Sequence, residues 1–555
     1  MRSRVTLALA ASGGLAFAGA AAAQDLLFLA SDVPAGLNYD GPAAAIPTSQ
    51  TGMVNVMEPL IDYAAAGTND EGITTPEFGQ FEGRLAESWS FDEASLTWTF
   101  NLRQGVTGCG GAEFTADDVL YTFERAKSVS GAAPIGWFLS NVGSIAGFTP
   151  DVFGEGADKS LGAEVAKIDD YTVTITQSEP NALFLPVLTI FGLYMFDKEG
   201  MEAQATEADP WSHDFTNNVG MASFGPYCVE RWTKDDEIVL TANENYYRGA
   251  PAIKTVVMKR VPQSSNRVVI LRTGQAQLVQ GLTPREYDSL RDAAGIAVGG
   301  VAGNENLFVH MNFDTPPFDN PLVRQAIAHA IPTEQIIQNA YFGQATVWNG
   351  HVPSSYPGYH QPERQYPYDP EGAAALLAEA GYPGGAGLDA YADALQLSYV
   401  AEKETTLGPI VNAIATALRG LGMPVDLNPI PQTQYGDRQL VKRDLPFAVN
   451  DQEKPIGVDA GYASQLFFVS PESGGLNNMV NYRNPAFDGL WAEARVEADA
   501  SVRDNLLAEM QDMLMEDVVW APVVEYKTQW AFADGLKGLR WYPDNSVRFF
   551  DLSFE

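Results

Sequence analysis

The side chains able to do chemistry in this 555-residue sequence are 70 acidic residues, five histidines and two cysteines. Two zinc-binding histidines on one face of a helix need H-x-x-H or H-E-x-x-H spacing. That spacing is absent among the histidines, which are His213, His310, His329, His351 and His360. Neither a G-x-S-x-G nucleophile motif nor a Walker A phosphate loop occurs. We therefore expect no metal site, no cofactor and no catalytic residue.

Paired carboxylates are the catalytic arrangement that this composition leaves open. Two acids on either side of a glycosidic bond can hydrolyse it, but no spacing distinguishes one pair among the 70 acidic residues. A secreted hydrolase that uses such a pair therefore remains the alternative to a protein that only binds its ligand.

The overall charge narrows the range of partners. The sequence holds 34 Lys and Arg against 70 Asp and Glu, a formal charge of −36. Nucleic acids and anionic membrane surfaces both require a basic face, so neither is expected as a partner. At roughly 100–200 residues per domain, the length predicts two to four structural domains.

The N-terminus carries the pattern of a secretory signal. Arg2 and Arg4 precede an apolar run over residues 5–18, and small residues follow at Ala21, Ala22 and Ala23. This predicts a signal peptide over residues 1–23 that is cleaved after Ala23. The run is shorter than the roughly 20 residues of a membrane span, so we expect the mature protein to be soluble outside the cytoplasm.

The two cysteines, Cys109 and Cys228, have one intramolecular pairing open to them in an oxidising compartment. Both lie beside turn residues, in Gly108-Cys109-Gly110 and Pro226-Tyr227-Cys228. We expect a disulfide. Two buried free thiols are the alternative, because the sequence cannot show whether the two Cα atoms come within about 7 Å of each other.

The local patterns are those of a mixed α/β protein. Thr115 with Asp118 forms a capping-box pattern, with Phe114 and Val119 as a hydrophobic staple, and predicts a helix that runs to about Lys127. Alternating residues predict strands over 98–102, 171–175, 237–241 and 254–259. Apolar periodicity and capping residues predict further helices over 323–330, 371–380, 407–421 and 504–517.

Four ordered blocks of sequence resemble a known family. The first contains LAESW at 85–89, LTWTFNLRQGV at 96–106 and FTADDV at 114–119. The others are GPY at 225–227, PFDN at 317–320 before VRQA at 323–326, and YPYDPE at 366–371 before LLAEAGY at 376–382. Together they resemble the bacterial extracellular solute-binding proteins of family 5, the peptide-, dipeptide- and nickel-binding components of ABC importers.

The resemblance implies an α/β fold of two hinged lobes, the periplasmic-binding-protein fold of class II, cluster C type. Lobe I would comprise residues 24–303 and 523–555, with an extra subdomain over about 59–168. Lobe II would comprise residues 304–522. The ligand would lie between the lobes, and closure around it would be a hinge motion.

The resemblance also suggests ligand-binding residues. Peptide-binding members hold the ligand ammonium with an Asp after a Gly-Trp pair; residues 447–462 lack the Trp and offer Asp451 and Asp459, with Tyr462 at the end of the stretch. The candidate cation for a ligand carboxylate is Lys403. Polar residues of an N-terminal loop that faces the cleft in relatives complete the candidates: Ser49, Gln50 and Thr51.

The favoured function is therefore a periplasmic substrate-binding protein of an ABC importer, without enzymatic activity. Its ligand would be a peptide, an opine, an amino-acid derivative or an oligosaccharide. The protein, expected to be a monomer, would deliver this ligand to a permease in the inner membrane. The hydrolase with paired carboxylates stays as the alternative.

Overall fold

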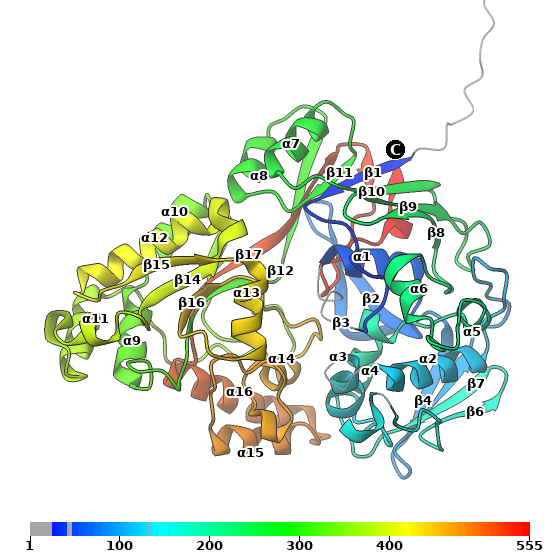
Figure 1. The fold of residues 1–555 in the computed structure, drawn as a ribbon, viewed down its shortest axis with the longest axis horizontal. Helices are drawn as coiled ribbons and strands as arrows, with labels where there is room; N and C mark the ends of the chain where they lie inside the picture. Colours follow the sequence, from blue (N-terminus) through cyan, green and yellow to red (C-terminus); the bar gives the residue numbers. More distant parts are fainter. Residues whose placement is uncertain (1–24, 41–46, 130–133, 155) are drawn as a thin grey trace, which may run out of the picture.

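The computed structural model describes residues 25–40, 47–129, 134–154 and 156–555. The expected signal peptide at 1–23 lies outside these residues. Two lobes lie side by side, and a pair of long strands runs through both (Figure 1). Among the described helices, none combines the length and apolar character needed to cross a membrane.

An 11-stranded mixed sheet connects the lobes, in the order β15-β14-β16-β12-β17-β11-β1-β10-β9-β8, with β13 also paired to β17. The strands of this sheet are β1 (Leu26–Ala30), β8 (Tyr227–Thr233), β9 (Glu237–Ala242), β10 (Thr255–Arg260), β11 (Leu278–Gln280), β12 (Ile296–Met311), β13 (Ala345–Val347), β14 (Gln396–Val400), β15 (Asp426–Ile430), β16 (Phe447–Asn450) and β17 (Trp520–Ala533). The strands predicted over 237–241 and 254–259 are β9 and β10.

Strands β12 and β17 form the long antiparallel pair between the lobes, from Ile296 opposite Ala533 to His310 opposite Trp520. Their register shifts between Ala302 and Glu305 and again between Leu307 and Phe308. Such bulges interrupt the ladder and bend the strand. The lobe boundaries expected at 303/304 and 522/523 fall inside these two strands, so continuous β-structure joins the lobes.

Lobe II holds the four helices that capping residues and apolar periodicity predict, which are α9 (Pro321–Ala330), α11 (Pro370–Glu379), α12 (Glu404–Gly420) and α16 (Ala500–Asp517). It also holds helices that were not predicted, namely α10 (Thr333–Ala340), α13 (Gln432–Gly436), α14 (Ala460–Phe467) and α15 (Pro485–Ala494). Asp369 caps α11 by accepting a hydrogen bond from the Gly372 amide, and Gly381 follows its end at φ +97°. Only glycine adopts this left-handed conformation without strain, which explains why the helix ends there.

Lobe I begins with β1 and the helix α1 (Pro47–Val56), whose residues Thr48–Val56 are all buried. The remaining elements of this lobe are β2 (Ile61–Thr68), β3 (Thr74–Gly83), α5 (Lys198–Glu202), α6 (His213–Asn218), α7 (Ser264–Arg272), α8 (Pro284–Leu290), β18 (Leu536–Lys537) and β19 (Ser553–Phe554).

A separate four-stranded sheet, in the order β4-β5-β7-β6, builds the extra subdomain of lobe I. Its elements are β4 (Ala86–Asp92), β5 (Thr97–Leu102), β6 (Val165–Asp169) and β7 (Thr172–Thr176), with α2 (Ala116–Ser128), α3 (Pro134–Trp137) and α4 (Phe184–Leu188). The capping box predicted at Thr115 and Asp118 is present at the start of α2. The expected end of this subdomain at 168 is too early, because β7 pairs with both β5 and β6.

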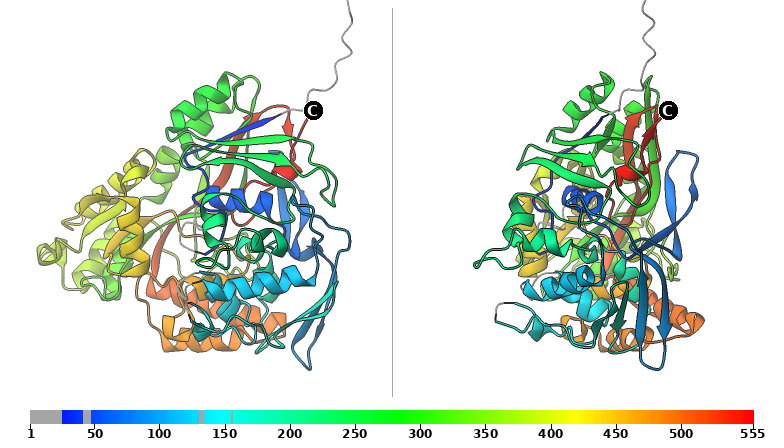
Figure 2. Two further views of the ribbon diagram at one scale, coloured as in Figure 1. Left: turned by 45° about the vertical axis from the view of Figure 1, so that its right-hand side comes forward. Right: turned by 90° about the vertical axis from the view of Figure 1, so that its right-hand side faces the viewer.

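The buried apolar side chains of lobe I continue into lobe II. One cluster contains Phe28 and Phe100 of lobe I together with Tyr462, Trp491 and Trp520 from α14, α15 and β17. A second cluster lies within lobe II, around Val309, Ile414 and Phe447. Figure 2 shows from two further sides that α14–α16 (orange) lie against the helices of the extra subdomain (cyan). Part of lobe II is therefore packed directly on lobe I.

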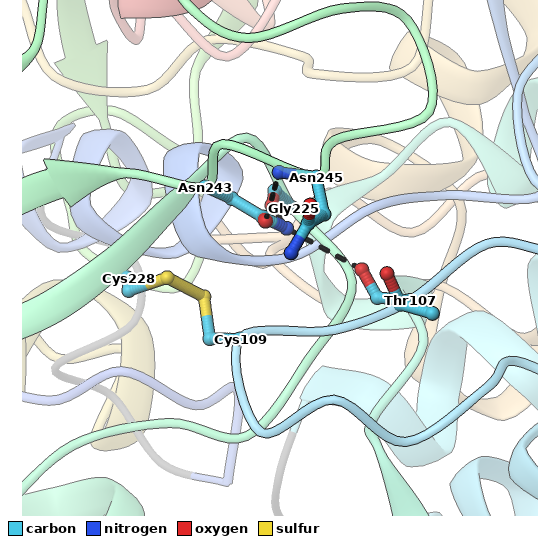
Figure 3. Close-up of a disulfide and its surroundings, with 6 residues drawn as sticks. All are labelled: Thr107, Cys109, Gly225, Cys228, Asn243 and Asn245. Atoms are coloured by element: carbon cyan, nitrogen blue, oxygen red, sulfur yellow. Dashed lines mark hydrogen bonds between the residues drawn. A yellow bond between two sulfur atoms is a disulfide. The ribbon is translucent and has the colours of Figure 1, made fainter.

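The predicted disulfide is confirmed: Cys109 and Cys228 are bonded, with their Cα atoms 5.8 Å apart (Figure 3). Next to the bond, the Asn243 side-chain amide donates to the carbonyls of Thr107 and Gly225, at 3.4 and 3.3 Å. The disulfide thus joins the segment after β5 to strand β8, at a point where a buried amide already holds the two segments together.

We expect removal of this disulfide to destabilise lobe I without weakening ligand binding. The bond joins residues 119 apart in sequence, for which the loop-entropy relation gives an upper figure of about 5 kcal/mol. The double variant Cys109→Ser/Cys228→Ser should therefore melt at a lower temperature in calorimetry and retain its Kd. An unchanged melting temperature would contradict this account.

Candidate functional site

The loop between β16 and α14, residues 451–459, approaches lobe I from lobe II. Ile456 of this loop lines a cavity together with residues of lobe I, namely Asp62, Tyr63, Thr189, Ile190, Tyr542, Pro543, Asp544 and Arg548. The cavity measures about 10 Å³, which is about the space of one water molecule. The two lobes are therefore in the closed arrangement at this point.

Asn304, at the bulge of β12, holds the same loop in place. Its buried side-chain amide donates to the carbonyls of Pro455 and Pro543, at 2.9 and 2.7 Å, and to the Tyr356 hydroxyl at 2.9 Å. Its carbonyl oxygen accepts from the Asn545 amide at 3.0 Å. One side chain thus joins the bend of the long strand pair, the loop of lobe II and the C-terminal segment of lobe I.

Tyr462 on α14 packs against aromatic side chains of lobe I. Its ring centroid lies 6.1 Å from that of Trp137 and 6.4 Å from that of Phe138. Tyr462 is 1% exposed, and burial raises the pKa of its phenol well above the usual value. The ring is therefore a neutral surface between the lobes at neutral pH.

Polar contacts around these rings connect the lobes far from the hinge strands. The Trp137 indole N–H donates to the Gly474 carbonyl at 2.9 Å, and the Gln465 amide donates to the Asn141 carbonyl at 3.1 Å. Arg495 of α15 forms an ion pair with Glu179. We call these three contacts the inter-lobe clasp; they link the extra subdomain to lobe II.

The expected ionic residues lie in lobe II, and each already has a protein partner. Lys403 Nζ is 2.8 Å from Asp451 Oδ1, so these two candidates pair with each other. Asp459 caps α14 by accepting from the amides of Gly461 and Tyr462. Arg503 also donates to both Asp459 carboxylate oxygens, at 2.9 and 2.7 Å.

This geometry changes the role of Asp459. Its side chain is 12% exposed, and a bidentate guanidinium already compensates its charge. A ligand ammonium at this carboxylate would have to displace Arg503. The structure thus uses Asp459 to anchor α14, which carries Tyr462 toward lobe I.

The candidates Ser49, Gln50 and Thr51 lie in helix α1, so the expectation of a loop is wrong. The polar sequence lacks an amphipathic pattern, yet the helix is enclosed on all sides by lobe I. The Ser49 hydroxyl accepts from the Ala35 amide, and the Thr51 hydroxyl accepts from the Val547 amide. These two hydroxyls therefore fix the helix to its neighbours.

Several residues near the loop carry no signal in the sequence. They include Asn304 and Lys454, whose Nζ lies 2.7 Å from Glu305 Oε1. Two interacting residues that lie more than 100 positions apart leave no local pattern in the sequence. The ligand-binding role of Lys403, Asp451 and Asp459 stays a prediction, and the protein partner of each charge depends on the tertiary fold.

With this geometry established, comparison with known proteins identifies the family. Residues 80–470 match the family described as "Bacterial extracellular solute-binding proteins, family 5 Middle". The chain belongs to this family. It is a solute-binding protein of ABC import, with the predicted α/β fold of two hinged lobes. The alternative of a secreted hydrolase finds no support among its relatives.

Individual relatives cover most of the chain. Heme-binding protein A of Haemophilus influenzae is 26% identical over 481 residues, 85% of this chain and 84% of that protein. The dipeptide-binding protein of Escherichia coli is 29% identical over 321 residues, 57% of this chain and 58% of that protein. The periplasmic binding protein DppA of Helicobacter pylori, in complex with the peptide STSA, superposes with a TM-score of 0.77 at 23% identity, over 96% and 98% of the two chains.

We expect Asn304→Ala to lower the free energy of unfolding by about 2–3 kcal/mol, because the buried carbonyls of Pro455 and Pro543 lose a donor. Denaturant titration measures this change. Asn505→Ala, on the exposed face of α16, is the matched control and should stay within about 0.5 kcal/mol of the wild type. Equal stability of both variants would mean that Asn304 does not hold the loop.

Arg495→Gln should favour the open form, because it removes the ionic part of the inter-lobe clasp. A partly exposed ion pair contributes about 0.5–1 kcal/mol, so ligand affinity should fall about two- to fivefold. Small-angle scattering should also give a larger radius of gyration. Arg483→Gln, which breaks a pair with Asp314 within lobe II, should change neither; an equal effect of both variants would contradict the clasp.

Proposed function

We propose that this chain is the periplasmic component of an ABC importer that encloses a peptide or another small polar organic solute between its two lobes. The observation that carries the proposal is the contact between loop 451–459 with α14 and the lobe I surface around Tyr63 and Trp137. A ligand at this position touches both lobes, and only the closed form offers all of its contacts.

The relatives support a peptide-like ligand. Their names and complexes include a dipeptide, heme and the peptide STSA, which share amide or carboxylate groups. Opines and amino-acid derivatives carry the same kinds of polar group. Oligosaccharides carry hydroxyl groups instead, and they complete the ligand search. The protein would act as a monomer and deliver the solute to the inner-membrane permease.

Some of the candidate ligand residues keep this role in the proposal. Tyr462 supplies an aromatic ring at the contact between lobe II and Phe138 of lobe I. Lys403 and Asp451 offer opposite charges that satisfy each other in the closed form at 2.8 Å. An ionic ligand could take either partner. Ser49, Gln50 and Thr51 are buried in helix α1 of lobe I. In the proposal they form part of the lobe I side of the ligand site.

A thermal-shift screen with peptides, opines, amino-acid derivatives and oligosaccharides tests the function. A true ligand at about 100 times its Kd should stabilise the protein by about 2.7 kcal/mol. Mass spectrometry should recover the ligand unchanged after long incubation, because the protein only binds it. Conversion of the ligand into a product would contradict the proposal.

A further inference from the structure

The cavity between Ile456 of lobe II and the wall of lobe I has two kinds of polar group in its lining. The charged groups and the hydroxyl groups belong to Asp62, Asp544, Arg548, Tyr63, Thr189 and Tyr542. The remaining side chains of the lining are apolar. The polar part of this wall comes entirely from lobe I, so it can be considered separately from the loop of lobe II.

Each charged side chain of this lining already has an oppositely charged partner. Arg84 Nη2 lies 3.2 Å from Asp62 Oδ2, and Arg548 Nη2 lies 3.1 Å from Asp544 Oδ2. None of these four side chains is more than 10% exposed. Lobe I therefore faces the loop of lobe II with buried ion pairs whose charges cancel.

The charged candidates on the lobe II side are paired in the same way, Lys403 with Asp451 and Arg503 with Asp459. A charged solute would either stay unpaired between the lobes or separate one of these pairs. In the second case the other member of the pair would lose its partner, and both outcomes cost free energy. An uncharged solute avoids both costs.

The Tyr63 hydroxyl differs from these paired groups. Tyr63 is 2% exposed, and its hydroxyl makes no well-aligned hydrogen bond to any residue that the structure describes. It lies close to the Thr189 side chain and to the Val458 backbone of the lobe II loop. Burial raises the pKa of the Tyr63 phenol, so the hydroxyl keeps its proton at neutral pH. A buried donor without a partner costs free energy, and an acceptor on the solute would remove this cost.

The other two hydroxyl groups of the wall offer acceptors. The Thr189 hydroxyl donates to the Pro186 carbonyl at 2.8 Å, and the Tyr542 hydroxyl donates to Asp551 Oδ2 at 2.9 Å. Their protons are thus committed, whereas their oxygens retain lone pairs that can accept. A hydroxyl group on a solute both donates and accepts. It therefore matches the donor of Tyr63 and the acceptors of Thr189 and Tyr542 without bringing a charge between the lobes.

We propose that the transported solute is an uncharged polyhydroxy compound, such as an oligosaccharide, and that the Tyr63 hydroxyl donates a hydrogen bond to one of its oxygens. The inference rests on the proposed function and narrows its ligand class. The cavity holds about one water molecule when the lobes are closed as described here. Loop 451–459 must therefore move away from lobe I to admit the solute and then close over it.

A thermal-shift library of matched compounds tests the ligand class. It contains neutral oligosaccharides and polyols, the corresponding sugar acids and amino sugars, and dipeptides with free or with blocked termini. We expect the neutral sugars or polyols to stabilise the protein, and their ionised analogues to bind at least about tenfold more weakly because an unpaired charge is buried. Calorimetry on the best compound should give a Kd that changes less than about twofold between about 50 mM and about 500 mM NaCl, since screening acts on charged partners.

Tyr63→Phe tests the residue, because it removes the hydroxyl and keeps the ring. It should weaken binding of that compound about tenfold and should not lower the melting temperature of the protein without ligand, since the hydroxyl has no partner to lose. Tyr121→Phe on α2 is the matched control, because the Tyr121 hydroxyl is also buried without a partner and lines neither cavity. This control should bind as wild type. A lower melting temperature of Tyr63→Phe without ligand would overturn the assignment, because the hydroxyl would then support the fold itself.

The outcomes separate the inference from the function on which it rests. Stabilisation only by ionised compounds or by blocked peptides would overturn the inference and leave the solute-binding function intact. Undiminished sugar binding in Tyr63→Phe, or an equal loss in Tyr121→Phe, would also overturn it, because the effect would then not belong to the Tyr63 hydroxyl. If no compound in the library stabilises the protein, the proposed function fails and the inference fails with it.

Discussion

The antiparallel pair of β12 and β17 is the constraint on which both lobes depend. Its ladder runs from Ile296 opposite Ala533 to His310 opposite Trp520, so the same two strands run through both lobes within one sheet. Relative motion of the lobes must bend this ladder, and the register shift between Ala302 and Glu305 provides the place where pairing is already interrupted. The position of the hinge is thus a property of strand register.

Residues at this bend also hold the loop of lobe II that we propose meets the ligand. Asn304 bonds the loop of lobe II, and Glu305, one residue further, pairs with Lys454 of that loop. A change of strand geometry would therefore move the ionic groups of the loop. The bend and the proposed ligand loop are thus joined by direct contacts.

Much of the fold could be predicted because its signals are local. The capping box of Thr115 and Asp118 and the cap of α11 at Asp369 depend on residues within one helical turn. The strands β5, β9 and β10 follow period-two patterns. Helix α1 was missed because its residues Thr48–Thr51 are polar and favour turns in isolation; its burial inside lobe I overrides that preference.

The site was predicted less well, since its properties depend on partners distant in sequence. Asp451 and Asp459 are equivalent in the sequence, whereas the fold pairs the first with a lysine and the second with an arginine. The Arg503 that compensates Asp459 is 44 residues away. The disulfide was predictable because only two cysteines exist in the chain.

That disulfide has a consequence for the integrity of the chain. Cys109 and Cys228 enclose α2 to α6 and every lobe I residue of the inter-lobe clasp. A protease that cuts the backbone once between the two cysteines produces two fragments that the sulfur bridge still joins. In an environment rich in extracellular proteases, a nicked molecule would keep its lobe I connected, and the cut would be visible only after reduction on a denaturing gel.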